Sequence, residues 1–175
     1  MTAHSERGFT LIELLIVVAI ISIIAAIAVP GLLRARMSGN EASAIASLRV
    51  TMTAQVGYAA SCGSGGYAAS YIILGTPVVA GSEAFISADL GLVAAPQKSG
   101  YNFTMGPGAG NAVGPNDCLA AANPTNTTYY ATALPQTFGS TGTRSFAVNH
   151  ANTIWQEIAA AAPAEPFGPP ATTIQ

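Results

Sequence analysis

Two successive hydrophobic patterns fill the first sixty residues of the chain. Residues 9–29 form an apolar run of twenty-one residues with a single charged side chain, Glu13. At about 1.5 Å of rise per residue, a helix over this run would be about 31 Å long, which matches the hydrocarbon core of a bilayer. The run therefore predicts a helix over 9–29 that can span a membrane.

Pro30 and the residues after it predict that this helix bends and continues. Pro30 removes one backbone donor and crowds the preceding turn, so we expect a kink there; the alternative is that the helix ends at Pro30. Across 30–60 the apolar residues recur at spacings of three, four and seven, which is typical of an amphipathic helix. The expected apolar stripe is Leu33, Met37, Ala44, Leu48, Met52, Val56 and Ala59, and the polar residues expected mostly on other faces are Arg34, Arg36, Asn40, Glu41, Ser43, Ser47 and Arg49.

The segment 61–158 predicts a globular α+β domain. After residue 60 the composition changes to Gly, Ser, Ala, Asn, Thr and Pro, and helical periodicity largely disappears. Three or four antiparallel strands that follow a long helix indicate a sheet packed over the apolar stripe of that helix. The expected strands are 100–105, 128–133, 144–148 and 153–156, with a hairpin turn at 149–152. A short helix is expected around 87–92 and a long loop over 106–124.

The last residues, 159–175, are rich in Pro and Ala and carry few charges. This composition predicts a tail that is disordered or loosely attached to the domain.

The overall composition excludes some classes of function. The chain is 50% hydrophobic and only 8% charged, against roughly 25% charged residues in ordinary soluble domains. The most hydrophobic residues are concentrated before Pro30, so the pattern indicates one exported domain with an apolar N-terminal segment. The formal net charge is −2 and the basic residues are scattered, so we expect no specific nucleic-acid site.

The two cysteines, Cys62 and Cys118, are consistent with one disulfide if the domain reaches an oxidising compartment. Such a bridge would tie back the loop 106–124. The alternative is a pair of buried free thiols. No CxxC or Cys/His spacing points to a metal site or to redox chemistry.

A short polar and charged segment, residues 1–8, precedes the apolar run, and the candidate cleavage site lies after Gly8. An ordinary secretory signal has an apolar region of about 7–15 residues with the cleavage site behind it. Here cleavage would occur in front of the apolar run. The hydrophobic helix would therefore stay on the mature chain, and residues 1–8 would be a leader peptide.

Glu13 is the informative exception within the apolar run. A carboxylate inside an apolar span costs on the order of 2.5–3.5 kcal/mol, so such a group normally finds a partner. The alternative is that Glu13 lies near the membrane interface and reaches the water. Cleavage after Gly8 would create an amine on Phe9, in the same chain or in a neighbouring subunit. A charge pair between this amine and Glu13 would fix the axial register between helices.

The sequence Arg7-Gly8-Phe9-Thr10-Leu11-Ile12-Glu13, followed by an apolar helix that reaches Pro30, resembles the signal of type IV prepilins and type II secretion pseudopilins. The resemblance implies that a prepilin peptidase cuts after Gly8 and methylates Phe9. It also implies that Glu13 serves in subunit docking, that Pro30 kinks the helix, and that the fold is pilin-like. Many pilins carry a cysteine-bounded loop near the C terminus, and this chain does not.

The same resemblance implies partners and a location. The partners are identical and related pilin subunits in a helical homopolymer, the prepilin peptidase, an inner-membrane assembly platform, and membrane lipid before assembly. The chain would first be a single-pass precursor in the bacterial inner membrane. It would then enter an extracellular pilus or a periplasmic pseudopilus.

No group of residues indicates catalysis, and we expect no cofactor. His150 is the only histidine beyond the leader and falls in a predicted turn. The glycines of 106–110 lack the Gly-Lys-Ser/Thr that follows in a phosphate-binding loop. Asp117 could contribute to a calcium site, but one carboxylate is weak support, so we expect no metal site.

These patterns favour a structural filament subunit over an enzyme. The leading hypothesis is a major pilin of a type IV pilus. The alternatives are a pseudopilin of a type II secretion system, or a minor pilin at a fibre tip that acts in adhesion.

Overall fold

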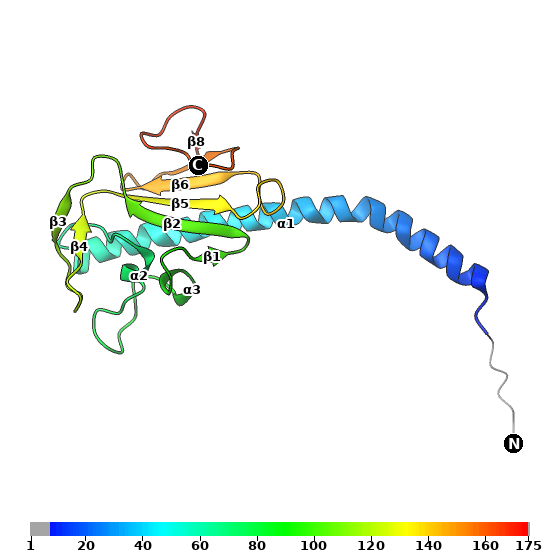
Figure 1. Ribbon diagram of the computed structural model, residues 1–175, viewed down its shortest axis with the longest axis horizontal. Coiled ribbons are helices and arrows are strands. Elements are labelled where there is room, and N and C mark those ends of the chain that lie inside the picture. The colour runs from blue at the N-terminus through cyan, green and yellow to red at the C-terminus, as the bar shows by residue number, and fades with distance from the viewer. Residues whose placement is uncertain (1–7, 175) are drawn as a thin grey trace, which may run out of the picture. The chain divides into compact units, whose positions relative to one another are not determined.

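The structure, a computed structural model, describes residues 8–174. The predicted leader therefore lies outside the described residues except for Gly8. The chain divides into two compact units, with the boundary between Arg36 and Met37. One long helix, α1 (Leu11–Ser61, 51 residues), contributes to both units (Figure 1).

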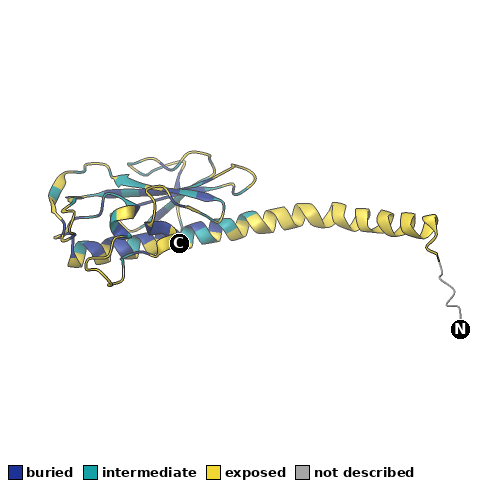
Figure 2. Cartoon of the chain, turned by 60° about the horizontal axis from the view of Figure 1, so that its bottom comes forward, coloured by how far each residue is buried: buried dark blue, intermediate teal, exposed yellow. Residues whose placement is uncertain are grey.

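The first unit is the N-terminal part of α1, and its side chains are uncovered. Every described residue up to Arg36 is exposed (Figure 2). The most apolar window of the helix has a mean hydropathy of 3.0 and is 0% buried, so by length and composition this helix could cross a membrane. The helix continues through Pro30 rather than ending there. The kink at Pro30 stays a prediction.

In the second unit, the rest of α1 packs against the domain through one continuous face. Its buried residues recur every three or four positions, as one side of a helix requires. They are Glu41, Ala44, Ser47, Leu48, Thr51, Ala54, Gln55 and Tyr58.

The expected apolar stripe was therefore wrong in part. Ala44 and Leu48 are fully buried, but Leu33 and Val56 are about half exposed, at 53% and 49%. Glu41 and Ser47 were expected on outer faces, and both are buried. The buried face mixes polar and apolar side chains, so a stripe chosen by apolar character alone is rotated away from it.

An antiparallel six-stranded sheet covers this face of the helix (Figure 1). The strand order is β1-β2-β5-β6-β7-β8. The four expected strands correspond to β2, β5, β6 and β7, and the expected hairpin joins β6 to β7. The strands are β1 (Gln97–Lys98), β2 (Tyr101–Pro107), β5 (Tyr129–Pro135), β6 (Ser145–Asn149), β7 (Ile154–Glu157) and β8 (Thr172–Thr173). The fold is α+β and pilin-like, as predicted, although the sheet has more than four strands.

The segment expected to be a long loop contains regular structure instead. Strands β3 (Val113–Asn116) and β4 (Pro124–Asn126) form a second, two-stranded sheet. These strands contain Gly114, Pro115 and Pro124, residues that are rare in strands and that hid them from a pattern search.

Two short helices lie between α1 and the sheet in sequence. They are α2 (Tyr71–Leu74), which the sequence did not indicate, and α3 (Ala88–Gly91), which was expected. The backbones of the two helices approach closely where Gly75, at the end of α2, meets Gly91 of α3. A Cβ atom added to Gly75 would lie only 2.2 Å from the Gly91 carbonyl oxygen. Glycine is therefore required where these backbones meet.

The prediction of a loose C-terminal tail is wrong. Strand β8 pairs with β7, and the Phe167 ring stacks on Trp155 with 5.1 Å between the centroids. The Tyr130 hydroxyl donates to the Pro163 carbonyl at 2.5 Å. The Glu165 carboxylate accepts from the Asn149 side chain at 2.6 Å. The prediction from composition was wrong because a few specific contacts hold the tail in place. Such contacts do not require the tail to be rich in apolar residues.

Glu41 joins α1 to the connection between β5 and β6. Its Oε1 accepts hydrogen bonds from the Thr143 backbone at 2.8 Å and the Thr143 hydroxyl at 3.0 Å. Its Oε2 lies 2.9 Å from Arg144 Nε and 2.7 Å from a terminal guanidinium nitrogen. Burial raises the pKa of Glu41, but these hydrogen bonds and the Arg144 charge outweigh it and hold the pKa below its ordinary value.

We expect Glu41→Gln to destabilise the domain by about 3 kcal/mol, at the low end for a broken buried ion pair because Arg144 is partly exposed. The measurement is urea unfolding of the full chain in detergent, with Trp155 fluorescence as the signal that reports unfolding. Because the folded pKa is lowered, the contribution is complete above the ordinary value of 4.5 and disappears as the pH falls through the folded pKa.

Glu83→Gln is the matched control, since Glu83 is an exposed glutamate in a loop. Equal unfolding midpoints for the two variants at pH 7 would contradict the role given to Glu41.

Candidate functional site at the start of the long helix

The chain approaches α1 in a non-helical segment. Gly8, Phe9 and Thr10 precede the helix, and the Phe9 side chain is 72% exposed. A Cβ atom added to Gly8 would meet nothing within 4 Å, so no packing in the described residues encloses this position. Gly8 and Phe9 are both exposed, so nothing within residues 8–174 covers the peptide bond between them.

Thr10 and Glu13 cap the helix reciprocally. The Glu13 backbone N–H donates to Thr10 Oγ1 at 3.3 Å, and the Thr10 backbone N–H donates to Glu13 Oε2 at 2.9 Å. The Thr10 hydroxyl also donates to Glu13 Oε2, at 2.6 Å. This is a capping box, in which the N-cap residue and the third helical residue each satisfy a backbone donor of the other.

The sequence-based prediction paired Glu13 with an amine at Phe9, in the same chain or in a neighbouring subunit, and missed this local role. The signal was available, since Thr-x-x-Glu directly before an apolar run is a capping-box pattern. A carboxylate in the first turn is also favoured by the helix dipole.

The capping box leaves Glu13 able to accept a further donor. Both hydrogen bonds that its carboxylate accepts within the described residues use Oε2 and come from Thr10. In the uncut chain the Phe9 nitrogen is an amide, so it carries no charge for Glu13 to pair with. The pairing of Glu13 with an amine at Phe9 stays a prediction.

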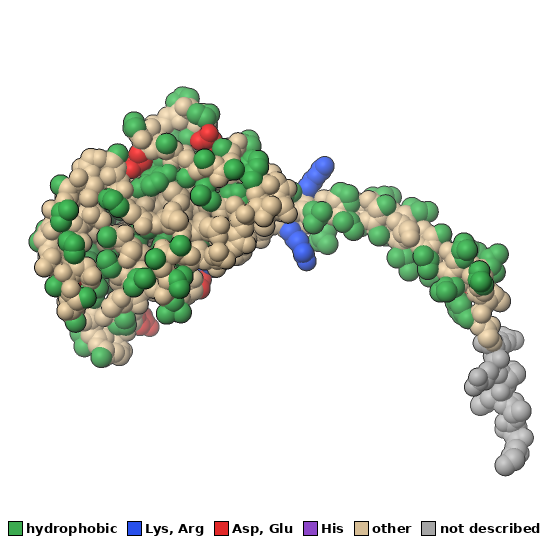
Figure 3. All heavy atoms as spheres, in the orientation of Figure 1, with side chains coloured by type: hydrophobic (Ala, Val, Ile, Leu, Met, Phe, Trp, Pro, Cys, Tyr) green, Lys and Arg blue, Asp and Glu red, His purple; other side chains and the backbone are tan. Residues whose placement is uncertain are grey.

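The N-terminal part of α1 has an apolar surface that can associate with lipid or with other helices. Figure 3 shows hydrophobic side chains along the N-terminal part of the helix. An exposed helix that is apolar on all sides is covered by lipid or by other helices. The large apolar side chains exposed between 9 and 33 are Phe9, Leu11, Ile12, Leu14, Leu15, Ile16, Val17, Val18, Ile20, Ile21, Ile23, Ile24, Ile27, Val29, Leu32 and Leu33.

The other end of α1 is fastened to the domain by a disulfide. Cys62 and Cys118 are bonded, with their Cα atoms 4.8 Å apart. The Cys118 backbone N–H also donates to the Cys62 carbonyl at 3.0 Å. The bridge therefore anchors the segment between β3 and β4 to the end of the helix.

Asp117, the residue considered for calcium, is occupied by its own chain. Its Oδ2 accepts from the Tyr58 hydroxyl at 2.7 Å and from the Asn123 amide at 3.1 Å. Its Oδ1 accepts from the backbone of Leu119 at 3.1 Å and of Asn123 at 2.9 Å. Burial raises the pKa of Asp117, and these donors more than offset it, so the pKa is lowered. Within residues 8–174, no cluster of His, Cys, Asp and Glu could hold a metal ion.

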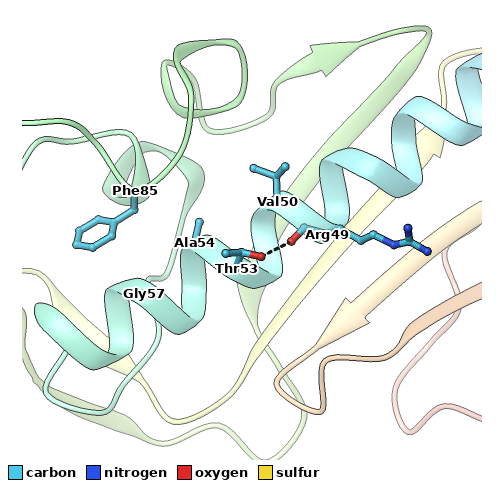
Figure 4. Close-up of a pocket in the computed structure, with 6 residues that line it drawn as sticks. All are labelled: Arg49, Val50, Thr53, Ala54, Gly57 and Phe85. Carbon is cyan, nitrogen blue, oxygen red and sulfur yellow. Dashed lines mark hydrogen bonds between the residues drawn. The ribbon is translucent and has the colours of Figure 1, made fainter.

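A shallow groove lies beside α1 (Figure 4). Its volume is about 340 Å³, and it is lined by Arg49, Val50, Thr53, Ala54, Gly57 and Phe85. Arg49 is the only charged residue in this lining. Its side chain extends away from Phe85 (Figure 4). His150 is exposed in the turn after β6, apart from the groove lining.

Comparisons with known proteins bear on the N-terminal segment. The family profile described as "Prokaryotic N-terminal methylation motif" matches residues 3–29. Over 50 residues the chain is 50% identical to the type IV major pilin protein PilA of Myxococcus xanthus, a match that covers 29% of this chain and 23% of that protein. Over 38 residues it is 58% identical to the type IV wide pilus major component PilA4 of Thermus thermophilus, which covers 22% of this chain and 29% of that protein.

The chain thus spans about a quarter of the length of these curated relatives. No solved structure matches it.

Reduction of the disulfide should destabilise the domain by about 4 kcal/mol, because the bond closes a loop with a sequence separation of 56 residues. Urea unfolding with and without reductant measures this difference. The double variant Cys62→Ser, Cys118→Ser should unfold like the reduced wild-type protein and should not respond to reductant. An unfolding midpoint that reductant leaves unchanged in the wild-type protein would contradict the stabilising role.

Proposed function

Because the chain carries the N-terminal methylation motif and helix of the type IV pilin family, we propose that it is a structural subunit, of the major-pilin kind, of a type IV pilus filament. The observation that carries this proposal is the first part of α1. It is apolar, exposed on every side, and preceded by Gly8 and Phe9 outside the helix.

Processing is the first step of the proposed function. A prepilin peptidase hydrolyses the bond between Gly8 and Phe9 and methylates the new amine on Phe9. The position of this bond in an exposed, non-helical segment supports the assignment. Cleavage there removes the leader and keeps the apolar helix, so the mature chain remains a membrane protein until it assembles.

Assembly replaces lipid around α1 with the helices of other subunits. The apolar part of α1 can span the inner membrane, from which an assembly platform would extract it. Helices of identical subunits lie parallel, because all are inserted in the same direction. In a bundle of this kind, Glu13 of one subunit pairs with the methylated Phe9 amine of a neighbour and sets the axial register.

The domain from Met37 onwards then faces outwards. Two of its buried ionic groups, Glu41 and Asp117, serve the fold. This arrangement supports a structural role over an enzymatic one.

The relatives also bear on which kind of subunit this is. Both are named as major pilus components, which favours a major pilin over a pseudopilin or a tip pilin. A major pilin is abundant in filaments sheared from the cell surface, whereas a tip protein is scarce there and a pseudopilin remains in the periplasm. Quantitative immunoblots of the sheared and cell fractions test the proposal, and absence of the chain from sheared filaments would overturn it.

Glu13→Gln should be processed normally and should reduce sheared filaments by about tenfold or more, since a lost charge pair of 1.4 kcal/mol already corresponds to tenfold. Gln is preferable to Ala, because Gln retains a side-chain acceptor for Thr10 and so preserves the capping box. The measurement is electron microscopy and immunoblotting of sheared material.

Ser22→Ala is the matched control in the same helix. The Ser22 hydroxyl donates to the backbone of its own helix, at the Val18 carbonyl, at 2.8 Å. Wild-type amounts of filament from the Glu13→Gln variant would remove the register argument.

A further inference from the structure

The hydrogen bonds at the start of α1 determine which carbonyl groups belong to the helix. The first helical bond runs from the Leu14 N–H to the Thr10 carbonyl at 3.3 Å. The preceding donor, the Glu13 N–H, goes to the Thr10 hydroxyl instead of a carbonyl. The regular hydrogen-bond ladder therefore begins at Thr10, two residues after Gly8.

The Thr10 hydroxyl occupies a donor that would otherwise extend the helix upstream. In an α-helix the N–H of residue i donates to the carbonyl of residue i−4. Continuation by one residue would join the Glu13 N–H to the Phe9 carbonyl. Continuation by one more would join the Ile12 N–H to the Gly8 carbonyl, which belongs to the bond proposed to be cut.

The surroundings of this segment favour such an extension whenever the cap is absent. Backbone donors near the apolar boundary of a membrane have few water molecules to bond with, so they seek acceptors within the chain. Carbonyl groups upstream are the nearest acceptors. A hydrogen-bonded helical turn over Gly8 and Phe9 would withdraw the peptide bond from a peptidase, because hydrolysis needs an accessible carbonyl carbon.

We propose that Thr10 is a positioning residue for leader removal, and that its capping hydroxyl keeps the bond between Gly8 and Phe9 outside the helix. This inference rests on the proposed function, which places cleavage after Gly8. In the hydrolysis, the hydroxyl of water bonds to the Gly8 carbonyl carbon. The C–N bond to Phe9 breaks, and the Phe9 nitrogen takes the proton to become an amine. Thr10 touches none of the reacting atoms and acts only on the backbone conformation.

The test compares variants at position 10 by their ability to cap. Thr10→Val has nearly the same shape but lacks an acceptor. Thr10→Ser and Thr10→Asn both retain a side-chain oxygen of the kind that N-cap positions prefer. Pulse-chase labelling in cells that contain the peptidase measures the rate at which the precursor loses residues 1–8. Only precursor that resists carbonate extraction is counted, so that a defect in membrane insertion does not affect the result.

We expect Thr10→Val to be processed at least about threefold more slowly, a change in the range that N-cap substitutions produce. Thr10→Ser and Thr10→Asn should be processed at the wild-type rate.

The outcomes separate this inference from the proposed function. A wild-type chain that is never cut after Gly8 would overturn the proposed function, and the inference with it. A wild-type chain that is cut, together with Thr10→Val cut at the same rate, would overturn the inference alone. Slow processing of Thr10→Asn and Thr10→Val alike would also overturn it, since recognition of threonine itself would then explain the result.

Discussion

The exposed apolar surface of the N-terminal part of α1 is the constraint on which the rest of the molecule depends. Removal of apolar surface from water is worth about 25 cal/mol per Å². None of the most apolar window of this helix is buried by the part of the chain that the structure describes. Lipid covers such a surface in a membrane, and equivalent helices can cover it in an assembly. In the proposed function, the charged and polar groups at the start of the helix determine how it is processed and aligned.

The second part of α1 meets a different requirement, because it must hold a domain of low charge. It does so with polar contacts as well as apolar ones. The Gln55 side chain donates to the Ala68 carbonyl and accepts from the Ala68 N–H, both at 2.9 Å. Tyr71 is packed against Thr51 of the helix, and burial raises the pKa of Tyr71 to about 12. Together with Glu41 and the disulfide, these contacts fix the domain along the helix.

Sequence reasoning succeeded where one repeated property determines structure. The apolar run of 9–29 needed only hydropathy and length. Strand β2 alternates clearly enough to be found, and strand β5 is rich in β-prone residues. It failed where single contacts decide the outcome. Glu41 is buried because Thr143 and Arg144 lie opposite it, about a hundred residues later in the chain. The tail is held by contacts such as that of Phe167 with Trp155, which composition does not reveal.

The candidate site shows the same division. The positions of Gly8, Phe9 and Glu13 follow from a short motif, and this motif is also what the family profile matches. The Thr-x-x-Glu spacing also predicts the capping role of Thr10, but the prediction for Glu13 rested on its charge alone. Sequence could not show which oxygen of Glu13 is occupied, because that depends on side-chain geometry.

The most direct test of the central claim is the intact mass and N-terminal sequence of the chain recovered from sheared surface filaments. The account predicts a polypeptide that begins at Phe9, carries one methyl group on its amine, and retains the whole apolar helix. A filament subunit that begins beyond residue 29, without that helix, would contradict it.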